Sequence, residues 1–311
     1  MDNPPGFLTR LFISAPEARL RSGWRLRTGW RLAVHLAILL AMMALLSIAW
    51  IGGRLLFGQG PVIGFVEAQL ISAIAFTASI IIARKYLDRR SFTSLGLRLN
   101  ANAWRDFIAG VLIATLMVFL IYFVERLAGW LTITGISLNQ APAVEVLLAM
   151  LIMLGVFLVT GWQEELYFRG YLLTNLSEGL RPVVGILLSS LIFGLAHLGN
   201  PRTTVLSVAG ICLFGLLMVF GLLRSGGLWL PVGLHAAWNF VEGPLLGFPV
   251  SGLSTYRLYQ TQIDGNPLLT GGAFGPEAGL VLLPALALGA GLIWIYTRPR
   301  HSTGKISQDT P

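Results

Sequence analysis

The sequence predicts an all-α protein: a polytopic transmembrane helical bundle of about eight spans, with both termini in the cytoplasm. Composition is the first observation, because 55% of the 311 residues are hydrophobic and 12% are charged, whereas a soluble domain carries about 25% charged residues. The second is a series of apolar segments, and the third is the clustering of basic residues in particular loops. We therefore expect an integral, multi-pass membrane protein. The preference for Arg over Lys is the reason that we expect a bacterial cytoplasmic membrane.

Each apolar segment is near the length that a membrane-spanning helix needs. About 20 residues, rising about 1.5 Å each, cross the ~30 Å hydrocarbon core. In lipid, a helix satisfies its own backbone hydrogen bonds, so we expect helices rather than strands. The expected helices cover residues 32–51, 62–83, 107–124, 144–162, 183–199, 204–223, 227–246 and 276–297.

Three regions follow from this pattern. A basic segment, 1–31, precedes a transmembrane helical domain, 32–297, whose core is about 144–246, and a tail, 298–311, follows. The N-terminal segment has two readings, an interfacial segment along the lipid head groups or a partly ordered charged tail. The Gly- and Pro-rich loop at 247–275 is expected to face outside.

Basic residues set the orientation. They concentrate in the N-terminal segment, in the loop 84–105 and in the tail, which the positive-inside rule places in the cytoplasm. The net charge of +8 is therefore interpreted as a topology signal and as lipid head-group contacts, and no nucleic-acid partner is expected. Cys212, the single cysteine, excludes an intrachain disulfide and a Cys-based zinc site.

The stretch GWQEELYFRG, 161–170, places three charges beside an apolar run. A charge inside a transmembrane helix costs about 2.5–3.5 kcal/mol on insertion scales. Glu165 and Arg169 are spaced i,i+4 with the acid first, the favoured order for a helical ion pair. Glu164 projects about 100° away and has no expected partner in its own helix. It is therefore the candidate general base.

Histidines in two later helices complete a candidate site. His197 follows Phe193 by one turn, and His235 and Asn239 are spaced i,i+4 on one side of a helix. Glu164 and His197 each lie about 16 residues from the polar turn near residue 180, so a helical hairpin would place them at equal depth. His235 reaches that depth only if the neighbouring hairpin is displaced.

Two chemistries and a structural interpretation are open for these residues. They could activate a water and stabilise an oxyanion, or Glu164, His197 and His235 could ligate zinc, although no H-E-x-x-H motif is present. Taken singly, each could instead be a membrane-edge charge or a helix–helix hydrogen-bond partner. We treat His35 and His301, at a span edge and in the tail, as non-catalytic, and Glu67 as an interfacial carboxylate.

Three motifs resemble the CPBP family of intramembrane proteases, which includes type II CAAX prenyl endopeptidases and Abi-like bacteriocin-processing or immunity proteins. The family motif EExxxR matches residues 164–169, FxxxH matches Phe193 to His197, and HxxxN matches His235 to Asn239. They occur in order, in successive apolar segments. Together they cover about 80 residues, with the fourth to seventh expected spans forming the family core.

The resemblance implies an intramembrane endopeptidase that cleaves a membrane-anchored peptide or protein. It assigns water activation to Glu164 and His197, oxyanion support to His235 and Asn239, and structural support to Glu165, Arg169 and Phe193. The family is described both as metalloproteases and as metal-free glutamate proteases, so the cofactor is none or Zn²⁺. We favour the metal-free form, because Asn239 is a poor zinc ligand and a good oxyanion donor.

Two other functions are compatible with parts of this pattern. A non-catalytic immunity or scaffold protein of the same family would tolerate loss of Glu164. A transporter or proton relay would spread polar groups through many spans, whereas here they concentrate in one cluster. The sequence predicts neither an oligomeric state nor a substrate sequence.

Overall fold

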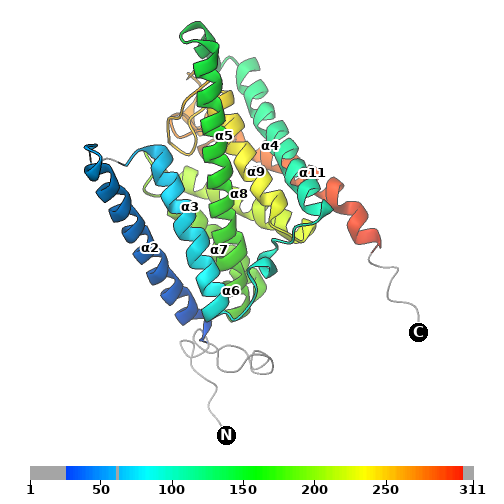
Figure 1. Cartoon of the computed structure of the whole chain (residues 1–311). Coiled ribbons are helices and arrows are strands. Elements are labelled where there is room, and N and C mark those ends of the chain that lie inside the picture. The colour runs from blue at the N-terminus through cyan, green and yellow to red at the C-terminus, as the bar shows by residue number, and fades with distance from the viewer. Residues whose placement is uncertain (1–25, 61–62, 304–311) are drawn as a thin grey trace. The chain divides into compact units, whose positions relative to one another are not determined.

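The computed structural model describes residues 26–60 and 63–303, and its elements can be followed in Figure 1. The chain divides into two compact units. Among the described residues, the first unit comprises 26–60, 63–98 and 162–189, and the second comprises 99–161 and 190–303. Most of the predicted N-terminal segment and most of the tail lie outside the described residues. The predicted three-region division of the chain stays a prediction.

The prediction of a mostly helical membrane protein is confirmed. In the described part of the chain, five helices are long and apolar enough to cross a membrane: Thr28–Leu56, Phe65–Leu87, Ala101–Leu127, Ala143–Gly179 and Val205–Ser225. Two shorter apolar helices, Pro182–Ala196 and Leu282–Arg298, match two further predicted segments. The span count of eight and the cytoplasmic placement of both termini stay predictions.

The first unit is built from two N-terminal helices and a helical segment from the middle of the chain. Helix α2 packs against α3, and the polar loop after α3 leads out of the unit. The elements are α2 (Thr28–Leu56), α3 (Phe65–Ile82), a π-helical turn (Ala83–Leu87), a 3-10 turn (Phe92–Leu95), a π-helical segment (Leu166–Leu172), α6 (Leu173–Gly179) and the first part of α7 (Pro182–Ala196).

A buried ion network connects α2, the turn after α3 and α6 within this unit. Asp88 accepts hydrogen bonds from Arg31 (2.9 Å) and from Arg84 (2.7 Å), and all three side chains are at most 1% exposed. Asn175, in α6, lies 3.5 Å from the same carboxylate. Arg31 and Arg84 were counted among the cytoplasmic basic residues; both guanidiniums are buried on one acid, so these two do not make the expected head-group contacts, and the topology stays a prediction. By contrast, Glu67 forms an ion pair with Arg54 at 3.6 Å and is partly exposed.

The second unit contains the remaining helices and a small sheet. Helix α9 packs along α4, and α11 packs against both α4 and α8. The elements are α4 (Ala101–Leu127), β1 (Leu131–Ile136), a 3-10 turn (Ser137–Asn139), most of α5 (Ala143–Glu165), the end of α7, α8 (Val205–Ser225), α9 (Trp229–Phe240), a π-helical turn (Val241–Leu245), β2 (Tyr259–Ile263), α10 (Pro267–Thr270), a 3-10 turn (Pro276–Ala278) and α11 (Leu282–Thr303).

The sheet corrects the all-α prediction in one place. Strand β1 pairs antiparallel with β2, from Leu131 opposite Ile263 to Ile136 opposite Tyr259, with an irregularity between Ile133 and Gly135. The two strands lie outside the expected helices, in the segment 125–143 and in the Gly- and Pro-rich loop 247–275. The loop 247–275 is therefore held by its strand β2 against β1, the strand that follows α4.

Glycines allow α9 to approach its neighbours at backbone contact. A Cβ on Gly233 would lie 2.2 Å from the carbonyl oxygen of Phe107, and a Cβ on Gly110 would lie 2.2 Å from that of Leu230. A Cβ on Gly161 would lie 2.9 Å from the amide nitrogen of Ala236. Small residues at such crossings let membrane helices pack closely. They fix the depth and rotation of α9, which carries His235 and Asn239.

Substituting Gly233 by Ala should destabilise the protein by roughly 1–3 kcal/mol, because the added methyl forces α9 away from α4. The measurement is the thermal unfolding temperature of the purified protein in detergent. Gly155→Ala is the matched control, since nothing lies within 4 Å of a Cβ there. In α5 this control should be neutral or slightly stabilising. Equal unfolding temperatures for the two variants would contradict the close-packing argument.

Candidate active site

The acid pair of the EExxxR segment sits where a continuous helix changes its winding. Helix α5 ends at Glu165 and continues as the π-helical segment Leu166–Leu172. Arg169 Nη1 donates a 2.9 Å hydrogen bond to Glu165 Oε1, and both side chains are at most 1% exposed. The predicted i,i+4 ion pair therefore forms, and it is fully buried. Such wide turns inside helices are frequent at functional sites.

Glu164 occupies the neighbouring position and is half-buried. The negative charge of Glu164 acts on the Arg169 guanidinium as well, although less strongly than that of Glu165. The prediction that Glu164 has no partner in its own helix was therefore wrong. The two acids still differ in environment, because the side chain of Glu165 is fully buried against Arg169, while that of Glu164 is partly exposed.

Contacts with α3 and α2 hold this segment in the first unit. Trp162 Nε1 donates to Thr77 Oγ1 at 3.0 Å, and Gln163 Nε2 donates to Gln69 Oε1 at 3.1 Å. His35 stacks on Tyr167, with ring centroids 5.8 Å apart, and packs on Tyr171 at 4.3 Å. These bonds and ring contacts brace the backbone on both sides of Glu164 and Glu165.

Sequence reasoning missed the role of His35, which it placed at a span edge. The imidazole is buried, and its Nε2 lies 3.2 Å from Ser79 Oγ. The signal that could have found it is the pair Tyr167 and Tyr171, spaced i,i+4 around the motif arginine. Two aromatic rings on one face of a helix need an apolar or aromatic partner.

In the second unit, His197 lies just past the end of α7 and is half-buried. Its Nδ1 is 2.9 Å from the carbonyl oxygen of Phe193. Because a carbonyl oxygen only accepts, Nδ1 carries the hydrogen in this arrangement, and in the neutral imidazole Nε2 carries the lone pair. Nε2 is thus the atom of His197 that can accept a proton or bind a metal.

His235 and Asn239 lie on α9, and both are buried. The ring of Phe193 contacts both imidazoles edge-on, with centroids 5.0 Å from His197 and 6.0 Å from His235. Phe214 of α8, which sequence reasoning did not single out, packs edge-on against His235 at 5.9 Å. Phe193 therefore joins the FxxxH and HxxxN motifs within one unit.

The structure thus assembles the candidate residues as two groups. Glu164, Glu165 and Arg169 belong to the first unit, and Phe193, His197, His235 and Asn239 belong to the second. The meeting of the two groups stays a prediction. Among the described residues, no cluster of three His, Cys, Asp or Glu side chains is arranged to hold a metal ion, and the candidate zinc ligands Glu164, His197 and His235 are divided between the units.

Comparison with protein-family models gives a match over residues 146–241 to type II CAAX prenyl endopeptidase Rce1-like proteins. Over these residues, slightly less than a third of the chain, the sequence is similar to the Rce1-like family. The comparison with curated proteins gives no match. The resemblance carried by the three motifs is confirmed over this region, which contains every candidate site residue. The chain is an integral membrane protein, and the similarity of residues 146–241 supports a protease at the general level.

A buried acid that sequence reasoning missed lies one residue beyond the Rce1-like region. Glu242 follows His235 by seven residues, or about two helical turns, so the spacing could have placed it on the same side of the helix. It is fully buried and lies next to Glu277, whose Oε1 accepts a 3.0 Å hydrogen bond from Ser251 Oγ. Burial raises the pKa of Glu277, which precedes the last apolar helix. These acids link the end of α9 to the loop segments around residues 251 and 277.

Proposed function

We propose that this protein is an intramembrane endopeptidase that hydrolyses a peptide bond in a membrane-anchored peptide or protein. The observation that carries the proposal is the unequal pair of acids at the start of the EExxxR motif. Arg169 is fully buried against Glu165, while Glu164 beside it is half-buried and accessible. Because Glu164 is partly exposed, its carboxylate can reach a water molecule, whereas the carboxylate of Glu165 is buried on Arg169.

In the proposed reaction, Glu164 and His197 activate a water molecule. The carboxylate of Glu164 removes a proton from the water as the oxygen attacks the carbonyl carbon of the scissile bond. A tetrahedral intermediate forms, and its oxyanion needs donors that are already in place. When the carbon–nitrogen bond breaks, the proton passes to the leaving amine, and the carboxylate is regenerated.

His235 and Asn239 would serve that oxyanion. Both lie on one side of α9, both are buried, and an amide N–H₂ and an imidazole N–H are suitable donors. The backbone contacts at Gly233 and Gly161 set the position of this helix without flexible side chains. Preorganised donors of this kind contribute about 10²–10³-fold each to acyl-transfer rates.

Removal of metal ions should leave activity unchanged in the metal-free form that we favour. Asn239 is the remaining polar residue of the HxxxN motif, and an amide is a weak zinc ligand. The measurement is cleavage by the purified protein after prolonged dialysis against a chelator, with metal content checked by elemental analysis. Loss of cleavage that returns with added Zn²⁺ would reject the metal-free form and would assign Glu164, His197 and His235 as ligands.

The proposal as a whole is tested by comparing peptide termini in membranes. Cells would make the wild-type protein, the Glu164→Gln variant or neither, and the new N- and C-termini of membrane peptides would be mapped by mass spectrometry. Termini that appear only with the wild type would establish proteolysis and identify the substrate. The same set of termini with the variant would contradict the proposal, and the absence of new termini in all three samples would favour a non-catalytic immunity or scaffold role.

A further inference from the structure

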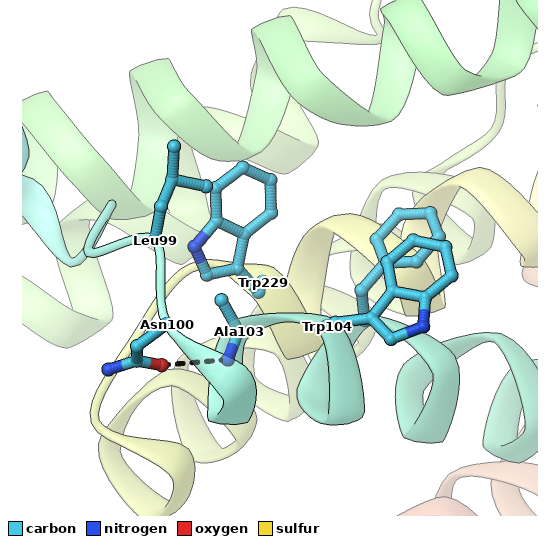
Figure 2. Close-up of a pocket in the computed structure, with 6 residues that line it drawn as sticks. Leu99, Asn100, Ala103, Trp104 and Trp229 are labelled. Carbon is cyan, nitrogen blue, oxygen red and sulfur yellow. Dashed lines mark hydrogen bonds between the residues drawn. The ribbon is translucent and has the colours of Figure 1, made fainter.

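An apolar cavity opens in the second unit, between the first turns of α4 and α9. Its volume is about 530 Å³, within the range of about 300–1,000 Å³ that is usual for ligand pockets. It is lined by Leu99, Asn100, Ala103, Trp104, Phe107 and Trp229. Figure 2 shows these side chains, contributed by the start of α4 and by Trp229 of α9. None of them belongs to the proposed catalytic machinery.

The lining chemistry suits an alkyl chain better than a polypeptide. Asn100 is the one residue with a side-chain amide or hydroxyl in the lining, and its Oδ1 already accepts a 3.0 Å hydrogen bond from the amide of Ala103. A peptide segment in this cavity would bring N–H and C=O groups that need partners. A saturated chain brings none and buries its surface against indole, phenyl and methyl groups.

The exposed residues in and next to the cavity lining have the character of a membrane interface. Leu99 is 83% exposed and Trp104 is 67% exposed, and Trp104 stacks on Phe107. Arg105, directly after Trp104, is also exposed. Tryptophan and arginine together are typical of the head-group level of a bilayer. The loop 84–105 that leads into α4 is the basic loop that we expect on the cytoplasmic side.

We propose that this cavity binds one acyl chain of an anionic phospholipid from the cytoplasmic leaflet, with the lipid phosphate at the level of Arg105. The cavity supplies the apolar contacts, and the exposed guanidinium supplies the preference for negative charge, because a basic residue near a membrane surface attracts anionic head groups. The cavity shares no residue with the proposed protease site, so the failure of either proposal would leave the other unaffected.

The test is photo-crosslinking of the full-length protein in vesicles. Phosphatidylglycerol and phosphatidylcholine would carry the same diazirine-labelled acyl chain, and adducts would be mapped by mass spectrometry. We expect adducts on the peptides that contain residues 99–107 and Trp229, about fivefold stronger with phosphatidylglycerol. Labelling spread evenly over all exposed helices, without a preference for these peptides, would overturn the proposal.

Three variants test the proposed site further. Ala103→Leu fills the cavity and should reduce labelling there about tenfold, whereas Ala109→Leu, on the same helix and outside the lining, should leave it unchanged. Arg105→Gln changes only an exposed side chain and should remove the preference for phosphatidylglycerol while keeping the acyl-chain adduct. Unchanged labelling in correctly folded Ala103→Leu would reject the site. Displacement of the probe by a lipid-modified peptide, but not by unlabelled phosphatidylglycerol, would reject the phospholipid as the occupant.

Discussion

Replacing Glu164 by Gln should reduce peptide hydrolysis about 10²–10⁴-fold, which is the usual contribution of a general base. The amide keeps the shape of the side chain and loses the basic oxygen. Glu164 is half-buried, and the buried bond to Arg169 is made by Glu165. The unfolding temperature should therefore stay close to that of the wild type. The measurement is single-turnover cleavage by purified protein, with thermal unfolding recorded on the same sample.

The matched substitution, Glu165→Gln, should give the opposite pattern. It leaves the guanidinium of Arg169 buried without its closest counter-charge, and breaking a buried pair in this way costs about 3–5 kcal/mol. We expect a clear fall in the unfolding temperature and in the yield of folded protein. If Glu165→Gln were stable and inactive while Glu164→Gln kept full activity, the two acids would have to exchange roles.

Local features of this fold could be predicted from the sequence because they depend on residues close together in the chain. The apolar runs identified each helix, since about 20 residues of low polarity are enough to cross a bilayer. The i,i+4 spacing of Glu165 and Arg169 was enough to predict their ion pair, because the geometry of a single helix fixes it. The same reasoning placed His235 and Asn239 on one side of α9.

Contacts between distant segments could not be predicted in the same way. Arg31 and Asp88 are 57 positions apart, and the arginine looked like one more charge in a basic segment. The pairing of β1 with β2 joins two segments that are far apart in the sequence. The alternation in LTITGI, 131–136, is typical of a strand, but it does not identify the partner strand. In both cases the partner is fixed by packing of the whole unit, which leaves little trace in a local pattern.

The candidate site contains both kinds of feature: those that local spacing predicts and those that depend on packing between distant segments. Each motif was found from its spacing, and the match to the Rce1-like family covers all of them. The spacing did not show that the charge of Glu164 also acts on Arg169, because the winding widens into a π-helical segment directly after Glu165. Nor did it indicate Phe214, whose contact with His235 depends on how α8 packs on α9.

Replacing Asp88 by Asn should destabilise the protein by about 3–5 kcal/mol, the usual cost of removing one partner from a buried ion pair. The carboxylate of Asp88 is the shared acceptor of Arg31 and Arg84, and all three side chains are at most 1% exposed. Asparagine fills the same space and leaves Arg84 facing a neutral amide, while Arg31 keeps only the partly exposed Glu178, 3.3 Å away, as a counter-charge. The measurement is the thermal unfolding temperature in detergent, supported by the rate of proteolysis of the folded protein.

Arg90→Gln is the control, because it also removes one charge from an ion pair, but from a pair that is partly exposed. Arg90 pairs with Glu178, which also lies 3.3 Å from Arg31 and stays in place in this variant. The Arg90 side chain is 47% exposed, and exposed pairs contribute at most about 1 kcal/mol. We therefore expect a small change for Arg90→Gln and a large one for Asp88→Asn. Adding Arg84→Leu to Asp88→Asn should recover part of the lost stability, because it removes a buried positive charge that no longer has its counter-charge. Equal unfolding temperatures for the two single variants would mean that the Asp88 network contributes no more than a surface pair.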